Sequence, residues 1–70
     1  NTKGVECAIF MYQIESMKYK VSLRSNGKVD VAKVAAFFGG GGHVRAAGAT
    51  MQGTFHDIAN NLSAQIELQL

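Results

Sequence analysis

Residues 21–42, VSLRSNGKVDVAKVAAFFGGGG, contain a strand, a turn, a helix and a stop signal in immediate succession. Hydrophobic and polar side chains alternate strictly over KYKVSLRS, residues 18–25, which predicts a strand with one buried and one polar face. Asn26 and Gly27 then form a strong turn signal. This order of local signals predicts a strand that turns back into a short helix.

The helix is predicted from a cap and an apolar stripe. Asp30 is a suitable N-cap residue. The apolar residues that follow it at helical spacing are Val31, Val34, Ala35 and Phe38. Four glycines at residues 39–42 end the helix, because each interior glycine costs about 1 kcal/mol relative to alanine and a glycine is a natural C-terminal stop.

The flanking segments supply the other elements. Residues 5–12, VECAIFMY, are apolar on both sides, which predicts an internal strand, and residues 13–17 are short enough for a hairpin connection. After the glycines, residues 43–47 could form a helical turn, and residues 49–52 could form a short strand.

A closing helix is predicted near the C-terminus. Thr54 and Asp57 resemble a capping box with Asp in place of Glu. The apolar stripe of this helix consists of Phe55, Ile58, Ala59, Leu62 and Ile66. The sequence therefore predicts a single α+β domain over residues 1–70, with the order β-β-α-β-α and two helices on one face of a small mixed sheet.

Composition narrows the class of protein. With 70 residues, the chain is one small domain, and 47% hydrophobic residues is typical of a globular fold. Seven Lys and Arg against five Asp and Glu give a net charge of +2, which permits a nucleotide or nucleic-acid partner without requiring one. A lone cysteine, Cys7, and the absence of a signal peptide or of a run of about 20 apolar residues predict a cytoplasmic protein without membrane contact.

The glycine run is the main candidate for chemistry. Glycines let a backbone approach a ligand closely, and successive amides can form a concave anion site. The alternative is a flexible connection between elements, but His43 directly follows the run and favours a ligand-facing loop. The run contains neither a P-loop motif nor a dinucleotide-binding fingerprint.

Other residues are less specific by themselves. Arg24 could fork onto a phosphate, but an exposed strand arginine is usually only solvated, and Ser25 has the same status. Arg45 is near the glycines without a defined role. His43 has no partner at metal-ligand spacing, and the acidic residues are scattered. The sequence thus predicts an anion-binding loop, with no catalytic residue and no metal ligand.

Two motifs together resemble a known family. Ser22 to Ser25 read S-L-R-S at the end of a strand, and Gly39 to Gly48 read G-G-G-G-H-V-R-A-A-G. This pattern resembles the DHH-associated domain, the C-terminal substrate-binding domain of DHH-family phosphoesterases. It looks most like the branch of nano-RNases and 3′-phosphoadenosine-5′-phosphate phosphatases, and the resemblance is weaker before Val21 and after Thr50.

The resemblance implies a function for the motif residues. Enzymes of this family hold two metal ions, usually manganese, in an N-terminal DHH domain, and the associated domain grips the nucleotide. Carried over by motif, the substrate-binding residues would be Arg24, Ser25, Gly39, Gly40, Gly41, Gly42 and His43. Arg45 falls at a variable position of the motif and inherits no role.

One departure defines what this chain can do. It contains no D-H-H sequence, so the metal ligands and hydrolysis would belong to an N-terminal DHH domain of a longer two-domain enzyme. The expected substrates of that enzyme are short oligoribonucleotides and adenosine 3′,5′-bisphosphate. The alternatives are a RecJ-type exonuclease, a cyclic-di-AMP phosphodiesterase, or a non-enzymatic RNA-binding module like the related domain of alanyl-tRNA synthetase.

Overall fold

The computed structural model describes Gly4 and residues 6–70, so Val5 of the predicted first strand lies outside the described residues. The fold is α+β as predicted, but the order of elements is ββαββα, with one strand more than the predicted order β-β-α-β-α. The elements are β1 (Cys7–Glu15), β2 (Lys18–Ser25), α1 (Val31–Phe37), β3 (Gly41–His43), β4 (Ala46–Gln52) and α2 (Phe55–Glu67).

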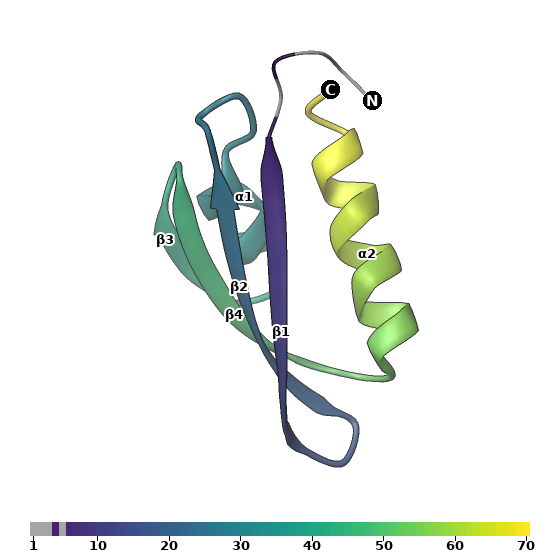
Figure 1. Ribbon diagram of the computed structural model, residues 1–70. Coiled ribbons are helices and arrows are strands. Elements are labelled where there is room, and N and C mark those ends of the chain that lie inside the picture. The colour runs from purple at the N-terminus through teal and green to yellow at the C-terminus, as the bar shows by residue number, and fades with distance from the viewer. Residues whose placement is uncertain (1–3, 5) are drawn as a thin grey trace.

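The four strands form one sheet in the order β1-β2-β4-β3 (Figure 1). All three pairings, β1 with β2, β2 with β4 and β4 with β3, are antiparallel, so the expected mixed sheet is wrong in this detail. The physical reason is connectivity. The short turns between β1 and β2 and between β3 and β4 require antiparallel neighbours. The connection through α1 makes β3 run parallel to β2, and the β3–β4 hairpin then places β4 between them, antiparallel to both.

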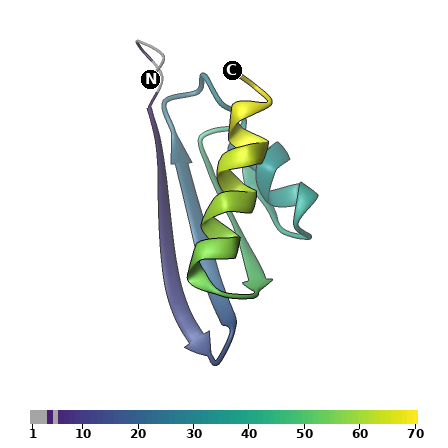
Figure 2. The ribbon, with the colours of Figure 1, turned by 90° about the vertical axis from the view of Figure 1, so that its right-hand side faces the viewer.

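Both helices cover the same face of the sheet, as predicted (Figure 2). Val21 and Leu23 of β2 and Met51 of β4 point toward them. The helices contribute Val31, Val34, Ala35, Ile58 and Leu62 to the same buried cluster, which Val29 completes. The opposite side of the sheet carries no helix and is called the open face below.

The caps of both helices confirm the sequence signals. The Asp30 side chain accepts a hydrogen bond from the Lys33 amide at 3.1 Å, and Thr54 accepts one from the Asp57 amide at 3.1 Å. Each cap satisfies an amide that has no partner inside its helix. No helix in the described part of the chain is long and apolar enough to cross a membrane.

Two expectations about the strands are corrected. β1 is an edge strand rather than an internal one, because it pairs only with β2 in the described sheet. Residues 43–47 do not form a helical turn. Instead, residues 44 and 45 form the turn of a hairpin, His43 ends β3, and β4 begins earlier than predicted, at Ala46.

Candidate phosphate-binding face

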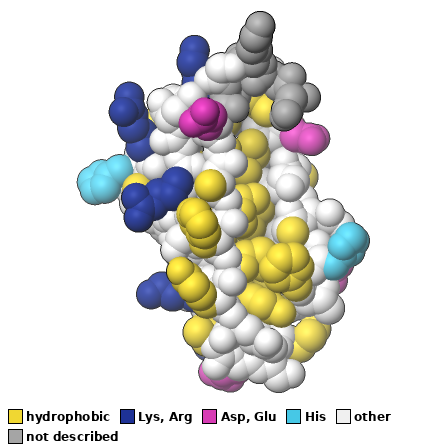
Figure 3. Space-filling view, viewed as in Figure 1, with side chains coloured by type: hydrophobic (Ala, Val, Ile, Leu, Met, Phe, Trp, Pro, Cys, Tyr) yellow, Lys and Arg dark blue, Asp and Glu magenta, His cyan; other side chains and the backbone are white. Residues whose placement is uncertain are grey.

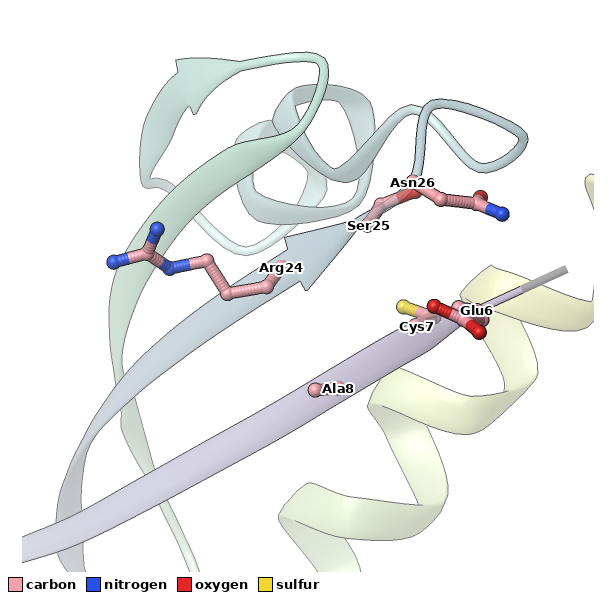
Figure 4. A pocket seen from close by; sticks show the side chains of 6 residues that line it. All are labelled: Glu6, Cys7, Ala8, Arg24, Ser25 and Asn26. Atoms are coloured by element: carbon pink, nitrogen blue, oxygen red, sulfur yellow. The ribbon is translucent and has the colours of Figure 1, made fainter.

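Arg24 lies on the open face because of the alternation in β2. Val21 and Leu23 are fully buried beneath the helices, so the residues between them point the other way. Arg24 is exposed near the end of this strand. Figure 4 shows its side chain extending away from Glu6. The guanidinium is therefore free to meet a ligand over the open face.

The strand register brings Arg24 and His43 onto the same row. Arg24 pairs with Ala46, and Ala46 pairs with His43. Directly paired residues of antiparallel strands point to the same face, so both side chains rise from the open face with only a methyl group between them. Their Cα atoms are two strand spacings apart, about 10 Å. A phosphate-sized anion above Ala46 would lie between the two cationic or hydrogen-bonding groups.

The neighbouring row of the open face has almost no side chains and is called the floor of the site below. Ser22 pairs with Gly48, and Gly48 pairs with Gly41. A Cβ atom added to Gly41 would have no neighbour within 4 Å, so the space above it is open. A hollow of about 390 Å³ lies beside this row, lined by Lys20, Val21, Ser22, Gly39, Gly40, Gly48, Ala49 and Thr50. The floor lets a ligand approach the backbone of β3 and β4.

The four glycines of the run serve different purposes. The Gly39 amide donates to the Ala36 carbonyl at 3.1 Å, and the Gly40 amide donates to the Ala35 carbonyl at 2.8 Å. These two amides therefore cap α1 and are not available to a phosphate. Gly41 and Gly42 belong to β3, where hydrogen bonding alternates between residues, so one of these two amides points away from β4.

Glycine is also required for packing in the run. A Cβ atom on Gly40 would overlap the carbonyl oxygen of Gly48, and one on Gly42 would lie 2.5 Å from the Cα atom of Ala47. The close approach of this segment to β4 therefore leaves no room for a side chain at either position. Gly39 and Gly41 both have free space, but Gly39 has a φ of 86°, which disfavours a side chain, so Gly41 alone in this run accepts one without strain.

The side chains of Ser25 and Arg45 are occupied elsewhere. The Ser25 hydroxyl oxygen accepts hydrogen bonds from the Gly27 amide at 3.0 Å and the Val29 amide at 3.4 Å. The Arg45 guanidinium lies over the turn, with its Nε atom 3.1 Å from the position of a Cβ on Gly27. Ser25 thus holds the β2–α1 turn, with its hydroxyl hydrogen left to donate, and Arg45 covers that turn.

Positive charge gathers along one side of the molecule, which includes part of the open face (Figure 3). Lys and Arg side chains and one His side chain crowd the side of the molecule where β2, β3 and β4 lie (left of Figure 3). Within the described residues, Lys18 pairs with Glu15 at 3.7 Å, whereas Lys20 and Arg24 form no ion pair. Lys20 was not among the predicted site residues, although the alternation that places Arg24 on this face places Lys20 there as well.

Cys7 and the acidic residues offer no catalytic group. Cys7 is half-buried next to the core, and burial raises the pKa of its thiol. A raised pKa lowers the thiolate fraction, so Cys7 is a poor nucleophile. Over residues 6–70 and Gly4, no three His, Cys, Asp or Glu side chains come together in a group that could hold a metal ion.

The sequence motifs agree with the comparison to known families. The model of the DHHA1 domain matches residues 1–68. The chain belongs to the DHHA1 domain family. This result confirms the family expected from the S-L-R-S and glycine motifs.

One curated relative of this DHHA1 domain is the bifunctional oligoribonuclease and PAP phosphatase NrnA of Thermus thermophilus. The two sequences are 59% identical over 57 residues, which cover 81% of this chain and 17% of the relative. The DHHA1 domain described here thus corresponds to less than a fifth of that protein.

Proposed function

We propose that this chain is the substrate-binding domain of a metal-dependent phosphoesterase that hydrolyses short oligoribonucleotides and adenosine 3′,5′-bisphosphate. The intact enzyme would act in the cytoplasm on nucleotides or short single-stranded RNA. The 59% identity to a bifunctional oligoribonuclease and PAP phosphatase supports this substrate class over a cyclic dinucleotide. The role of this domain is to hold the substrate, since its described residues offer no metal site.

The observation that carries the proposal is the row formed by Arg24, Ala46 and His43. A guanidinium and an imidazole stand on either side of a small residue, with a floor of Gly48 and Gly41 next to them. Arginine can donate two parallel hydrogen bonds to a phosphate, and the imidazole of His43 can donate a third. This set of donors fits a terminal phosphate, which carries more charge and more free oxygens than an internal phosphodiester.

Binding in this way would orient the nucleotide rather than change it chemically. Holding the terminal phosphate fixes the distance of the neighbouring ester bond from any catalytic group on the facing domain. The manganese ions expected for the intact enzyme would be held by an N-terminal DHH domain of the same chain. The 70-residue segment alone should therefore hydrolyse no phosphoester, and metal-dependent hydrolysis by it would contradict the proposal.

The test compares two arginine variants. Calorimetric titration of the intact protein with adenosine 3′,5′-bisphosphate, in metal-free buffer, measures binding without turnover. Arg24→Lys keeps the charge but loses the forked geometry, and it should weaken binding by about tenfold or more, the cost of one hydrogen bond to a charged group. Arg45→Lys is the matched control, because Arg45 lies over the turn at Gly27 instead of the open face.

Two results would contradict the assignment of the site. One is an Arg24→Lys protein that binds as tightly as the wild type. The other is an equal loss of affinity in Arg45→Lys and Arg24→Lys. A His43→Ala variant provides an independent check and should also weaken binding. NMR titration of the 70-residue chain locates the site directly, since the amides of Gly41 and His43 should shift, and those of α2 should not.

A non-enzymatic RNA-binding module is the second candidate. The positive side of the molecule in Figure 3 is consistent with RNA contact. Such a module would bind long RNA without preference for an end, and its affinity would fall steeply with salt. With a net charge of +2, we expect a shallow salt dependence and a preference for phosphorylated ends instead.

A further inference from the structure

The β1 side chains on the open face are more apolar than is usual for a solvent-exposed edge strand. Phe10 and Tyr12 lie on the open face with 49% and 60% of their surface exposed. Edge strands more often carry charged residues at such positions, because an exposed apolar edge promotes aggregation. No element of the described chain covers these two rings, and the buried core lies on the other face.

The register connects the rings to the phosphate-binding residues. Phe10 pairs with Ser22, in the row of the bare floor, and Tyr12 pairs with Lys20. Phe10 is thus diagonal to Arg24 across the strands, about 7–8 Å away between Cα atoms. The two rings stand on the same side of β1 about 7 Å apart, the spacing of residues i and i+2 in a strand. Along β1, Phe10 and then Tyr12 therefore lie progressively farther from Arg24.

The composition of this surface selects nucleic acid over protein. Lysine is depleted in protein–protein interfaces, whereas single-strand binding sites combine cationic side chains with aromatic rings on which bases stack. Here Lys20 is directly opposite Tyr12 and forms no ion pair within the described residues. Each ring can take the face of a base while the neighbouring cation meets the phosphate that follows it.

We propose that Phe10 and Tyr12 form a stacking shelf for the bases that follow the first nucleotide of a single-stranded RNA. The inference rests on the proposed function, since the terminal phosphate at Arg24 and His43 sets where the strand begins. The first nucleotide lies over the floor of Ser22, Gly48 and Gly41. The next base meets Phe10, and the one after it meets Tyr12 beside Lys20.

The shelf predicts a dependence on substrate length. A mononucleotide such as adenosine 3′,5′-bisphosphate does not reach the rings, whereas a trinucleotide contacts both. Base stacking on an aromatic side chain is sequence-tolerant, because every base has a π-face. The shelf should therefore strengthen the binding of short oligonucleotides of any sequence.

The experiment uses the intact protein in metal-free buffer and two ligands, adenosine 3′,5′-bisphosphate and a trinucleotide RNA. The double variant Phe10→Leu, Tyr12→Leu keeps an apolar surface but removes the ring faces. Its affinity for the trinucleotide should fall by between about fivefold and a hundredfold per ring, and its affinity for the mononucleotide should not change. Phe37→Leu is the matched control, because Phe37 is an exposed aromatic residue on α1.

Each other outcome is decisive. Unchanged trinucleotide affinity in the double variant overturns the shelf and leaves the proposed function intact. An equal loss for both ligands also overturns it, and indicates that the rings contact another part of the protein. If the wild type binds neither ligand, the proposed function fails and the shelf fails with it. Thermal unfolding of each variant checks that the fold is retained, as expected for exposed side chains.

Discussion

Replacing Gly41 by alanine separates ligand contact from folding. A Cβ atom at Gly41 would meet no atom within 4 Å, and the φ angle of this residue is not in the left-handed region. The folded state therefore accepts the methyl group. Alanine also restricts the unfolded chain more than glycine does, so the free energy of unfolding should stay the same or rise by up to about 1 kcal/mol.

The same substitution one residue earlier has the opposite result. A Cβ atom on Gly40 would overlap the Gly48 carbonyl oxygen and lie 2.6 Å from the Ala49 Cβ atom. Overpacking of this kind costs about 1–3 kcal/mol. A domain of 70 residues has a total stability of about 4–10 kcal/mol. A loss of about 2 kcal/mol would lower the melting temperature by about 8–16 °C.

Two assays on the same samples complete the test. Circular dichroism gives the melting temperature of each variant, and calorimetry gives its affinity for adenosine 3′,5′-bisphosphate. Gly41→Ala should melt like the wild type or slightly higher, yet bind about tenfold more weakly, because its methyl group occupies the floor where the phosphate meets the backbone.

Either of two results would refute the reasoning. If Gly41→Ala binds as well as the wild type, the ligand does not approach the floor of the open face. If Gly40→Ala melts like the wild type, the contact between the glycine run and β4 is looser than the structure shows. Gly40→Ala is not used as a binding test, because its fold is expected to change.

Three further predictions concern stability and reactivity. The Gln69 side chain accepts from the Asp30 amide at 2.8 Å and donates to the Asp30 carbonyl at 3.1 Å, so Gln69→Ala should lower the free energy of unfolding in urea by about 1–3 kcal/mol, while the exposed Gln52→Ala should change it little. Leu62 is fully buried, and Leu62→Ala should cost about 2–5 kcal/mol; a loss below 1 kcal/mol, measured by thermal unfolding, would contradict its place in the core. Burial raises the pKa of the Cys7 thiol, so iodoacetamide should label Cys7 more slowly in the folded than in the unfolded chain; equal labelling rates would contradict this. The contribution of this thiol to the free energy of unfolding should be fully present below the ordinary thiol pKa of about 8.5 and should fall as the pH rises above it.

The elements that the sequence predicts well are those fixed by local signals. Helix α1 follows from Asp30 and an apolar stripe within a few residues of it. Strand β2 follows from its alternation, which also places Arg24 on the side away from the core. Each of these signals lies within about eight consecutive residues, so the elements can be predicted without knowing any long-range contact.

The elements that the sequence predicts poorly depend on distant contacts. β3 consists of Gly41, Gly42 and His43, which have little intrinsic tendency to form a strand, and it exists because residues 44 and 45 turn the chain back onto β4. The apolar outer side of β1 suggested burial in the middle of a sheet. In the structure this side is exposed at an edge of the sheet, where the proposed stacking shelf would use it.

The glycine run has a fixed length as well as a fixed composition. Its first two amides are bound to the end of α1, and its last two residues are paired with β4, so no slack remains between the helix and His43. In a strand, a shift of one residue turns every side chain to the opposite face. Deleting a single glycine would therefore turn the imidazole toward the core side, even though the motif would still read as glycines followed by histidine. In this chain the number of glycines is thus a geometric quantity that sets the direction of the histidine.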